Sequence, residues 1–443
     1  MNHPRPRPTN RDEVLAAARE ASVELVHLQF TDVPGAIKSV TIPGSRLARA
    51  LDDGAWFDGS SVEGLARVAE RDLYLRPDPS TFAILPWETT PSARLICDLG
   101  LPGGAPFQAD PRAVLQASLA RAAEAGWQYR VSCEVEFFVF EGSERPSDLV
   151  PVDRSGYFEL QGSRAATLCC QAIEALEAFG VEVASTHHEV GPGQYEIDLA
   201  EQDALLAADG LVALKWALRA LARRAGLRVS FMPKPIETAS GSGLHVAQAL
   251  VGPSGDNAFF DREQRYGLSA LAGHFMAGQL AHARGMCAII APLVNSYKRL
   301  AGGAEAPSRV TWARVNRGAL LRVPEALAGP SARIELRAPD PACNPYLALS
   351  AVLQAGLDGI ERDLPLPEPV EEPAIDEEVA EQLASPLPAT LGEALEELEW
   401  DPVVREALGQ PVVERFLVAK EREWLAFSRH ISHWERQRYL DTA

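Results

Sequence analysis

The sequence predicts an α+β protein built from a small, mainly β unit and a larger unit that mixes strands with helices. The chain has 443 residues, of which 47% are hydrophobic and 23% charged, so it can bury a large core and long disordered regions are not expected. The β-type segments before residue 101 are short, and a single helical segment accompanies them. Beyond that point strands and helices do not alternate regularly, which argues against a doubly wound parallel sheet.

The N-terminal unit follows a proline-rich stretch, residues 1–10, that we expect to be loosely ordered. A turn at Asp32-Val-Pro-Gly35 joins its first two strands. Its predicted elements are a helix and five strands, at Asp12–Ala21, Val23–Phe30, Ala36–Ile42, Leu73–Leu75, Phe82–Leu85 and Ala93–Asp98. The Gly- and Pro-rich segment Leu101–Pro106 ends the unit, so we expect domains at 1–105 and 106–443.

The larger unit is expected to contain five strands and five helical segments. The strands are predicted at Gln128–Phe140, Gln194–Leu199, Arg228–Met232, Leu244–Leu250 and Ala332–Arg337. The helices are predicted at Pro111–Ala125, Arg164–Phe179, Ala204–Ala225, Arg265–Arg284 and Pro345–Ile360. An acidic loop is expected at Glu368–Glu381, and an amphipathic helical tail at Pro411–Leu440.

Composition excludes several classes of function. The formal charge of −19 and the pI near 5.0 argue against a nucleic-acid partner and against an anionic membrane surface. The longest apolar stretch, Met286–Val294, is far too short to cross a bilayer, and the N-terminus has no apolar signal-peptide core. The six cysteines form no CxxC pair or disulfide-type spacing. We therefore expect a reduced, cytoplasmic protein.

Carboxylates are placed where they could bind a cation. On the predicted strand Cys133–Phe140, Glu134 and Glu136 share one face, where they repel each other unless a cation lies between them or both face solvent. Glu189 and Glu196 lie on either side of the Gly191-Pro-Gly193 turn and could converge.

Two further segments add a histidine, a glutamate and arginines. In Gly241-Ser-Gly-Leu-His245 the glycines allow a ligand to approach the backbone, although a lone histidine is more often a core residue. On the strand Arg333–Arg337, Glu335 shares a face with both arginines. This oxygen-rich set suits Mg²⁺ or Mn²⁺ better than Zn²⁺.

An arginine cluster beside metal-type ligands indicates phosphoryl transfer, because arginine binds carboxylate and phosphate in a bidentate manner. Its members, with one lysine, are Lys298, Arg299, Arg317, Arg322, Arg333 and Arg337. The sequence contains no GxxxxGK[ST] motif, so a P-loop is excluded.

In combination these motifs resemble those of type I glutamine synthetases, in the same order across almost the whole chain. The matching segments are Trp56–Ser61, Cys133–Phe140, His187–Glu196, Phe231–Pro235 with Gly241–His245, Asn295–Leu300, Asn316–Pro324, Arg333–Asp340 and Asn344–Tyr346. The resemblance implies an N-terminal β-grasp domain and a catalytic domain with an antiparallel-sheet funnel flanked by helices. It also implies a dodecamer of two hexameric rings, with each active site shared between neighbouring subunits.

The resemblance also assigns roles to individual residues. It implies two or three Mg²⁺ or Mn²⁺ ions, held by two ligand sets: Glu136, Glu189 and Glu196, and Glu134, His245 and Glu335. It matches Arg299 and Arg337 to glutamate and phosphoryl binding, with Gly241 also in the amino-acid site, and Arg317, Arg322 and Arg333 to ATP binding. It matches Asp58 and Ser61 of a neighbouring subunit, with Tyr157 and Glu305, to the ammonium site. Glu305 also matches a flap residue.

The implied reaction transfers the ATP γ-phosphoryl group to glutamate, and ammonia then attacks the acyl phosphate. Several positions depart from the family pattern: Ser240 replaces an asparagine, Ala247 a histidine, Ala249 a serine and Glu201 an aromatic residue. Three interpretations therefore stay open: a glutamine synthetase, a related ligase for another small amine, or a non-catalytic regulatory relative.

Regulation is partly predictable from the same resemblance. Because no tyrosine lies between Tyr346 and Tyr439, we expect no control by adenylylation of a late-loop tyrosine. Arg67 resembles an arginine linked to glutamine feedback, although it could equally be a surface arginine.

Overall fold

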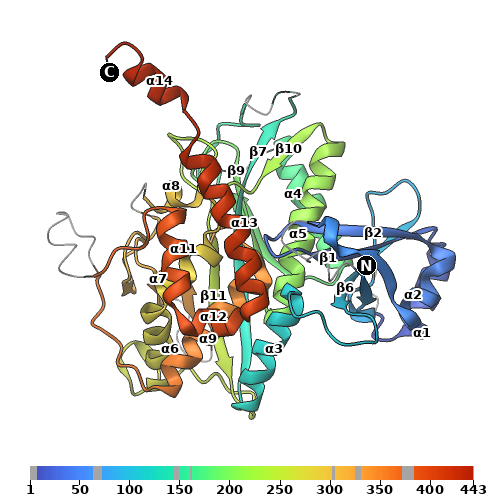
Figure 1. Ribbon diagram of the computed structural model, residues 1–443, viewed down its shortest axis with the longest axis horizontal. Helices are drawn as coiled ribbons and strands as arrows, with labels where there is room; N and C mark the ends of the chain where they lie inside the picture. Colours follow the sequence, from blue (N-terminus) through green and yellow to red (C-terminus); the bar gives the residue numbers. More distant parts are fainter. Residues whose placement is uncertain are drawn as a thin grey trace.

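The computed structural model describes residues 7–62, 72–143, 145, 149–159, 162–301, 305–324, 331–371 and 384–442. These residues form a smaller N-terminal sheet and a larger sheet that carries most of the helices (Figure 1). The strands of each sheet come from separate stretches of the chain and do not alternate regularly with helices. The predicted α+β class is therefore confirmed, whereas the division at residues 105 and 106 stays our proposal.

The N-terminal sheet has the order β2-β1-β6-β4-β3, with β5 paired to β6. Its strands are β1 (Leu25–Thr31), β2 (Ile37–Pro43), β3 (Ala55–Asp58), β4 (Asp72–Pro77), β5 (Ala83–Ile84) and β6 (Ser92–Gly100). The helices α1 (Arg11–Glu20) and α2 (Leu47–Asp53) accompany them. The sheet is mixed, because β1 runs parallel to β6 and antiparallel to β2. Gly35, at φ 99°, adopts in the predicted turn a conformation that favours glycine.

The larger sheet has the order β12-β13-β14-β11-β7-β9-β8, with β10 paired to β7. Its strands are β7 (Gln128–Glu141), β8 (Val183–His188), β9 (Gln194–Asp203), β10 (Leu227–Ser230), β11 (Leu244–Val251), β12 (Trp312–Ala313), β13 (Leu321–Arg322) and β14 (Ile334–Leu336). Apart from the parallel pair β12–β13, the named pairs are antiparallel. The long central strand β7 contacts three others and so organises the sheet.

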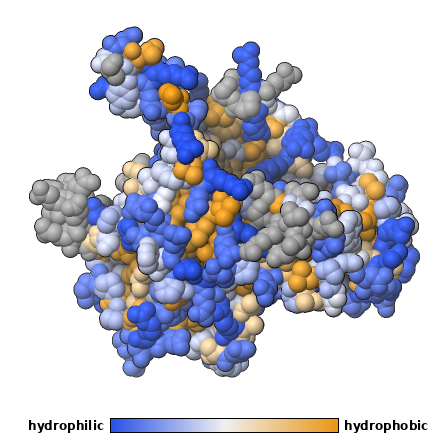
Figure 2. All heavy atoms as spheres, in the orientation of Figure 1, coloured by the Kyte–Doolittle hydropathy of each residue, from blue (hydrophilic) through white to orange (hydrophobic). Residues whose placement is uncertain are grey.

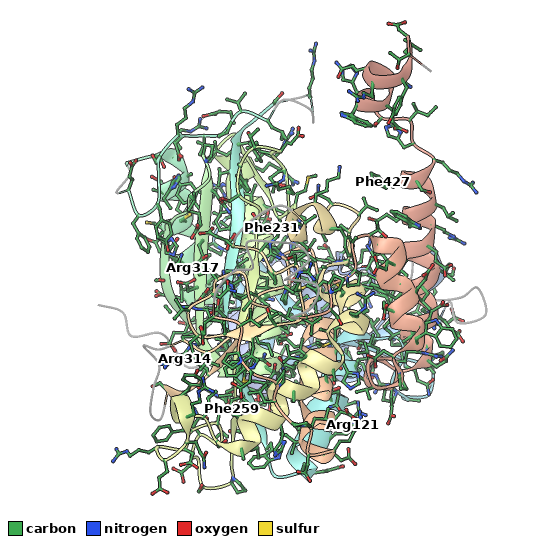
Figure 3. The ribbon with its side chains drawn as sticks, turned by 90° about the vertical axis from the view of Figure 1, so that its left-hand side faces the viewer. Arg121, Phe231, Phe259, Arg314, Arg317 and Phe427 are labelled. Carbon is green, nitrogen blue, oxygen red and sulfur yellow. The ribbon has the colours of Figure 1, made fainter. Side chains whose placement is uncertain are left out.

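Helices pack against this sheet and against one another. They are α3 (Pro111–Glu124), α4 (Arg164–Ala178), α5 (Ala204–Arg224), α6 (Ala270–Ala281), α7 (Ala283–Ile290), α8 (Ser296–Leu300), α9 (Pro345–Glu361), α11 (Leu391–Trp400), α12 (Pro402–Leu408), α13 (Gln410–Ser428) and α14 (His433–Tyr439). In the side view of Figure 3, the strands lie to the left and the red helix α13, marked by Phe427, lies to the right.

Two predicted helices have different limits in the structure. The helix expected at Arg265–Arg284 begins at Ala270, because Tyr266 has φ 64° and Ser269 caps the helix N-terminus. It ends near His282, where α7 starts. The C-terminal tail is divided into α13 and α14, and Ser432 forms a capping box with Glu435 at the start of α14.

The terminal helix α14 projects away from the rest of the chain (Figure 1). It carries exposed hydrophobic side chains, with Trp434 62% and Leu440 78% exposed, and hydrophobic residues are visible on this arm in Figure 2. Within the described residues, no helix is long and apolar enough to span a bilayer. The six cysteines are free thiols, five of them buried.

Candidate active site

The central strands of the larger sheet carry the predicted glutamates on one face. Along β7, Glu134 and Glu136 alternate with side chains that are buried in the hydrophobic core. The strand register places Glu134 opposite His245 of β11 and Glu136 opposite Glu196 of β9. Four predicted ligands therefore meet because three neighbouring strands pair in this register.

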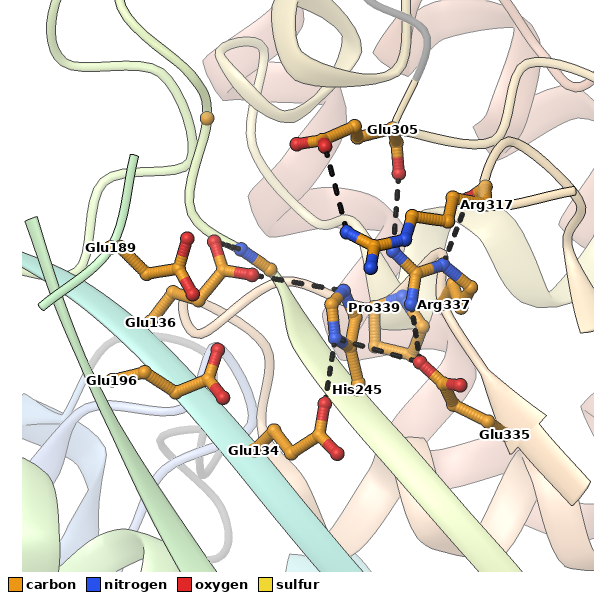
Figure 4. A network of polar contacts seen from close by, with 12 residues as sticks. Glu134, Glu136, Glu189, Glu196, His245, Glu305, Arg317, Glu335, Arg337 and Pro339 are labelled. Carbon is orange, nitrogen blue, oxygen red and sulfur yellow. Dashed lines mark hydrogen bonds and ion pairs between the residues drawn. The ribbon is translucent and has the colours of Figure 1, made fainter. Parts of the chain in front are cut away.

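The first cluster consists of Glu134, His245 and Glu335. His245 Nδ1 lies 3.0 Å from Glu134 Oε2 and 3.7 Å from Glu335 Oε1. One donor atom from each residue lies within 4.8 Å of the others, which is compatible with binding of a single metal ion. Figure 4 shows the three side chains directed toward one another. The structure thus brings together one of the two predicted ligand sets.

The protonation of His245 suits this arrangement. Burial lowers the pKa of His245 to about 4, and the positive charge of Arg337 acts in the same direction. The imidazole is therefore neutral near pH 7, the form in which histidine binds a metal.

Glu136 lies between the first cluster and the remaining glutamates. Its Oε2 atom accepts hydrogen bonds from the Gly243 backbone N–H, at 2.9 Å, and from Gln194 Nε2, at 3.1 Å. Its Oε1 atom lies 3.8 Å from His245 Nε2. These contacts fix the carboxylate in one orientation, and Gln194 is a positioning residue that the sequence did not indicate.

Glu189 and Glu196 direct their carboxylates toward the space beside Glu136 (Figure 4). Burial raises the pKa of Glu189 to about 7, and the negative charge of Glu136 adds to this effect. Burial also raises the pKa of Glu196, with contributions from Asp198 and Glu136. Each shift reflects first the burial of the carboxylate and then the negative charge of its neighbours.

Glu196 also has two neighbours that were not in the predicted ligand set. His187 Nε2 lies 3.2 Å from Glu196 Oε1, and donor atoms of His187, Glu196 and Asp198 lie within 4.8 Å of one another. A signal was present in the sequence, because Asp198 is two residues after Glu196 on the same strand face. The register then places His187 of β8 opposite Glu196.

The donor set fits a hard divalent cation. It offers several carboxylates and one neutral imidazole. The carboxylates with raised pKa values would be stabilised in their charged form by a positive ion. Oxygen-rich sets of this kind favour Mg²⁺ or Mn²⁺ over Zn²⁺.

Arginines surround the carboxylate of Glu335. Arg322 Nη1 lies 3.0 Å from Glu335 Oε2, and Arg337 donates to Glu335 Oε1. Arg337 also donates from Nε to the carbonyl oxygen of Arg317, at 2.9 Å. The side chains of Arg317 and Glu305 are exposed and lie 3.9 Å apart, directly above this group (Figure 4). Positive charge thus lies on one side of the carboxylates.

Arg299 has a different environment from that of an exposed substrate-binding arginine. It is 5% exposed, and its guanidinium donates hydrogen bonds to three backbone carbonyl oxygens. These belong to Arg337 at 2.8 Å, Ala338 at 2.8 Å and Pro339 at 3.1 Å. Arg299 therefore fixes the segment after β14. Its contact with glutamate stays a prediction.

Two glycines allow this close packing. A Cβ atom on Gly241 would lie 2.7 Å from the Pro233 carbonyl oxygen and 2.8 Å from Arg299 Cγ. A Cβ atom on Gly243 would lie 2.7 Å from Arg299 Nη2 and 2.9 Å from His245 Nε2. The glycines of this motif are thus required by the closeness of the backbone to the site residues.

The predicted ammonium-site residues lie in separate parts of the structure. Asp58 ends β3, at the edge of the N-terminal sheet, and accepts hydrogen bonds from the backbone N–H and hydroxyl of Ser60. Ser61 lies in the short 3-10 turn after β3, but its side chain is outside the described part of the chain. Arg67 falls outside the described residues altogether. Asp58 is therefore not on the sheet that carries the glutamates.

Tyr157, by contrast, lies beside the second group of carboxylates. Its ring centroid is 5.7 Å from that of His187 and 4.0 Å from that of Phe158. Burial raises the pKa of Tyr157, and the charges of Glu189 and Glu196 contribute. The hydroxyl group is therefore protonated near pH 7 and is available as a hydrogen-bond donor.

Three of the positions that depart from the family pattern lie on neighbouring parts of the larger sheet, Glu201 on β9 and Ala247 and Ala249 on β11. Ala247 lies between Ser132 and Glu335 in the strand register. Arg333 Nη1 donates to Ser132 Oγ at 2.9 Å. Glu201 Oε1 lies 3.7 Å from the guanidinium of Arg130. Small side chains and an ion pair thus occupy this end of the face.

Comparison with known proteins agrees with this geometry. Residues 22–102 match the glutamine synthetase β-grasp domain, and residues 108–439 match the glutamine synthetase catalytic domain. Glutamine synthetase of Thermus thermophilus is 45% identical over 97% of this chain and 98% of its own length. That of Halobacterium salinarum is 43% identical over 98% of this chain and 97% of its own length.

Solved structures lead to the same family. A GmaS/ADP complex superposes with a TM-score of 0.88 at 31% identity, covering 98% of this chain and 100% of that chain. Apo GmaS superposes with a TM-score of 0.86 at 32% identity, covering 96% and 99%. These matches cover 96–98% of the chain. The chain therefore belongs to the glutamine synthetase family of ATP-dependent ligases.

Proposed function

We propose that the protein joins ammonia to the side-chain carboxylate of glutamate, using ATP and passing through γ-glutamyl phosphate. The observation that carries the proposal is the cluster of Glu134, His245 and Glu335 beside two arginines. Arg322 and Arg337 both contact Glu335, so metal-type ligands and anion-binding groups share one site. Transfer of a phosphoryl group to a carboxylate needs both, because two anions must be brought together.

The carboxylate of glutamate is unreactive toward amines because its oxygen is a poor leaving group. Phosphorylation forms an O–P bond to the γ-carboxylate and releases ADP, and attack by ammonia then releases phosphate. Divalent ions bound by the glutamates and His245 would supply neutralisation of the phosphate charge. Arg337, anchored by Arg317 and the segment that Arg299 fixes, would orient the reacting carboxyl group.

We further propose that Arg317, Arg322 and Arg333 contact the phosphates of ATP, and that Ala247, Ala249 and Glu201 line the nucleotide end. Glu305 would close over the intermediate and limit hydrolysis. Its exposed position above Arg337 supports this role, since the Glu305 carbonyl oxygen lies 3.4 Å from Arg337 Nη2.

The ammonium site is proposed to be completed by a second copy of the chain. Asp58 lies on the edge strand of the N-terminal sheet, so a neighbouring subunit is the proposed source of Asp58 and Ser61 beside Tyr157. We propose the dodecamer of two hexameric rings on this basis. The projecting α14, with Trp434 and Leu440 exposed, supports assembly. The free thiols are consistent with a cytoplasmic location.

A second candidate function is ligation of glutamate to another small amine. Ser240 stands where asparagine is usual, and the chain superposes closely on GmaS. The two functions are separated by phosphate release with ATP, glutamate and Mg²⁺ or Mn²⁺, comparing ammonium with methylamine and larger amines. The highest kcat/KM with ammonium supports a glutamine synthetase. Turnover restricted to an alkylamine supports the second function. Silence with all acceptors, despite metal binding, supports a non-catalytic relative.

A further inference from the structure

The loop between β7 and α4 lies beside the second group of carboxylates. Its described part, residues 149–159, carries Tyr157 and Phe158, whose ring centroids are 4.0 Å apart. The ring centroid of His187 is 5.7 Å from that of Tyr157 and 4.7 Å from that of Phe158. His187 Nε2 in turn lies 3.2 Å from Glu196 Oε1. Tyr157 and Phe158 thus form an aromatic wall on one side of the carboxylates.

The backbone of this aromatic wall is held in an unfavourable conformation. Phe158 has φ 59°, in the left-handed region that residues with a Cβ atom rarely adopt. Its backbone N–H donates a hydrogen bond to the carbonyl oxygen of His188, at 3.1 Å. Such a conformation persists only where surrounding contacts maintain it. The loop is therefore fastened to β8 by specific contacts.

Asp153 is the centre of the contacts that hold the loop. His188 Nε2 lies 2.8 Å from Asp153 Oδ1, and the Gly193 backbone N–H donates to the same oxygen at 3.2 Å. The hydroxyl of Tyr195 donates to Asp153 Oδ2 at 2.6 Å. Although burial opposes the shift, the hydrogen bonds from Tyr195 and His188 lower the pKa of Asp153. The carboxylate is therefore charged near pH 7, and hydrogen bonds to a charged acceptor are the stronger kind.

His188 and Tyr195 connect Asp153 with the rest of the site. Each of these two side chains belongs to a residue that is 3% exposed. His188 Nδ1 lies 2.6 Å from the carbonyl oxygen of Glu189. Because the single O–H of Tyr195 is given to Asp153, Ser163 Oγ, at 2.8 Å, donates to the tyrosine oxygen. Ser163 is the N-cap of α4, so Tyr195 joins the two ends of the loop, one before the aromatic wall and one after it.

We propose that Asp153, His188 and Tyr195 form a clamp that positions Tyr157 in the acceptor site and thereby limits the size of the amine. The inference rests on the proposed function, in which Tyr157 belongs to the ammonium site. The three clamp residues are positioning residues, because they act through the loop and not by contact with the substrate.

Discrimination between small amines depends on the stiffness of such a wall. Ammonium and methylamine differ by one methyl group, which a loop that yields can accommodate and a fixed loop excludes. A loosened wall also allows ammonium to bind in unproductive orientations, which weakens its use as an acceptor. Release of the clamp should therefore change which amine is preferred, and not only the rate of the reaction.

The first test measures hydrogen–deuterium exchange by mass spectrometry on the full-length protein without ATP or metal, so it does not depend on turnover. Tyr195→Phe keeps a ring beside Phe137 and His188 and removes only the hydroxyl. We expect the amides of residues 153–159 to exchange about 10-fold faster, because one buried hydrogen bond is lost. Tyr129→Phe is the matched control. It removes another buried tyrosine hydrogen bond, to Gln248 Oε1 at 2.8 Å, near the opposite end of β7.

The second test compares ammonium and methylamine as acceptors. In Tyr195→Phe and in Asp153→Asn, the ratio of kcat/KM for methylamine to that for ammonium should rise by about 10-fold. The change should come mainly from a higher KM for ammonium, with the KM for ATP close to that of the wild type. Tyr129→Phe should leave the ratio unchanged, because a general loss of stability does not alter the choice of amine.

The clamp is overturned if residues 153–159 exchange at the wild-type rate in both variants. Faster exchange with an unchanged amine ratio overturns the role of the clamp in the acceptor site. Absence of turnover by the wild type with every amine would overturn the proposed function and this inference together, so the two failures are distinguishable.

Discussion

His245 of β11 faces Glu134 of β7 across an antiparallel strand pair, with His245 Nδ1 3.0 Å from Glu134 Oε2. The histidine of this pair is shielded from bulk solvent, because His245 is 8% exposed. A neutral imidazole beside a carboxylate, with Glu335 completing the group, has the properties of a metal-binding site rather than of a surface ion pair.

Glu134→Gln is expected to weaken Mn²⁺ binding by about 100-fold or more, because the neutral amide of glutamine cannot replace the negative charge of the Glu134 carboxylate. Titration calorimetry with Mn²⁺ measures this directly. Glu141→Gln, near the end of the same strand and paired with Arg164 on the surface, is the matched control and should bind Mn²⁺ normally. Equal affinities of the two variants would remove Glu134 from the ligand set.

Gly243→Ala is expected to lower activity severely with little loss of secondary structure. Its Cβ atom would approach Arg299 Nη2 to 2.7 Å and His245 Nε2 to 2.9 Å, so one of the two must move. Gly162→Ala is the control, because its Cβ would meet no atom within 4 Å. The measurement is kcat/KM together with circular dichroism. Normal turnover by Gly243→Ala would show that neither side chain is held rigidly for function.

Arg299→Lys separates two roles of that residue. If Arg299 mainly fixes the backbone at Arg337–Pro339, the lysine variant loses hydrogen bonds of about 1.5–3 kcal/mol each and unfolds at lower denaturant concentration, with a lower kcat. If it mainly binds glutamate, the KM for glutamate rises while stability is retained. Denaturation and kinetics on the same preparation decide between them. We expect the first result.

His282 is expected to give the protein a pH-dependent stability. Its imidazole lies 2.8 Å from Asp401 and 2.9 Å from Asp358, and these carboxylates raise its pKa above 6.5 although burial opposes the shift. A raised histidine pKa stabilises the folded state fully below about pH 6.5, and the contribution is lost as pH rises through the folded-state pKa.

The free energy of unfolding, measured in denaturant from pH 5.5 to 9, should therefore fall with pH more steeply in the wild type than in His282→Gln. His433→Gln, at an exposed position on α14, serves as the control. Parallel profiles for the wild type and His282→Gln would contradict the assignment.

The faces of the strands could be predicted from the sequence, but their register could not. Alternation alone places Glu134 and Glu136 on one side of β7. That His245 lies opposite Glu134 depends on the pairing of strands more than a hundred residues apart, which no local pattern specifies. The resemblance to a known family supplied this expectation instead.

Other features of the fold and of the site were not predicted from the sequence. β8 was not predicted because its residues Ser185, Thr186 and His187 are polar, and so the contact of His187 with Glu196 was missed. The contacts of Arg299 with three carbonyl oxygens could not be foreseen, since they depend on how the chain returns after β14. Tyr266, at positive φ, likewise interrupts a segment whose composition favours a helix.

The proposed synthesis of glutamine is tested most directly by following ¹⁵N-ammonium by NMR in a reaction with glutamate, ATP and Mg²⁺, while ADP and phosphate are measured in the same tube. We predict ¹⁵N in the side-chain amide of glutamine, with one phosphate released for each amide formed and no product from Glu134→Gln. Phosphate release without amide formation, or amide formation that persists in Glu134→Gln, would contradict it.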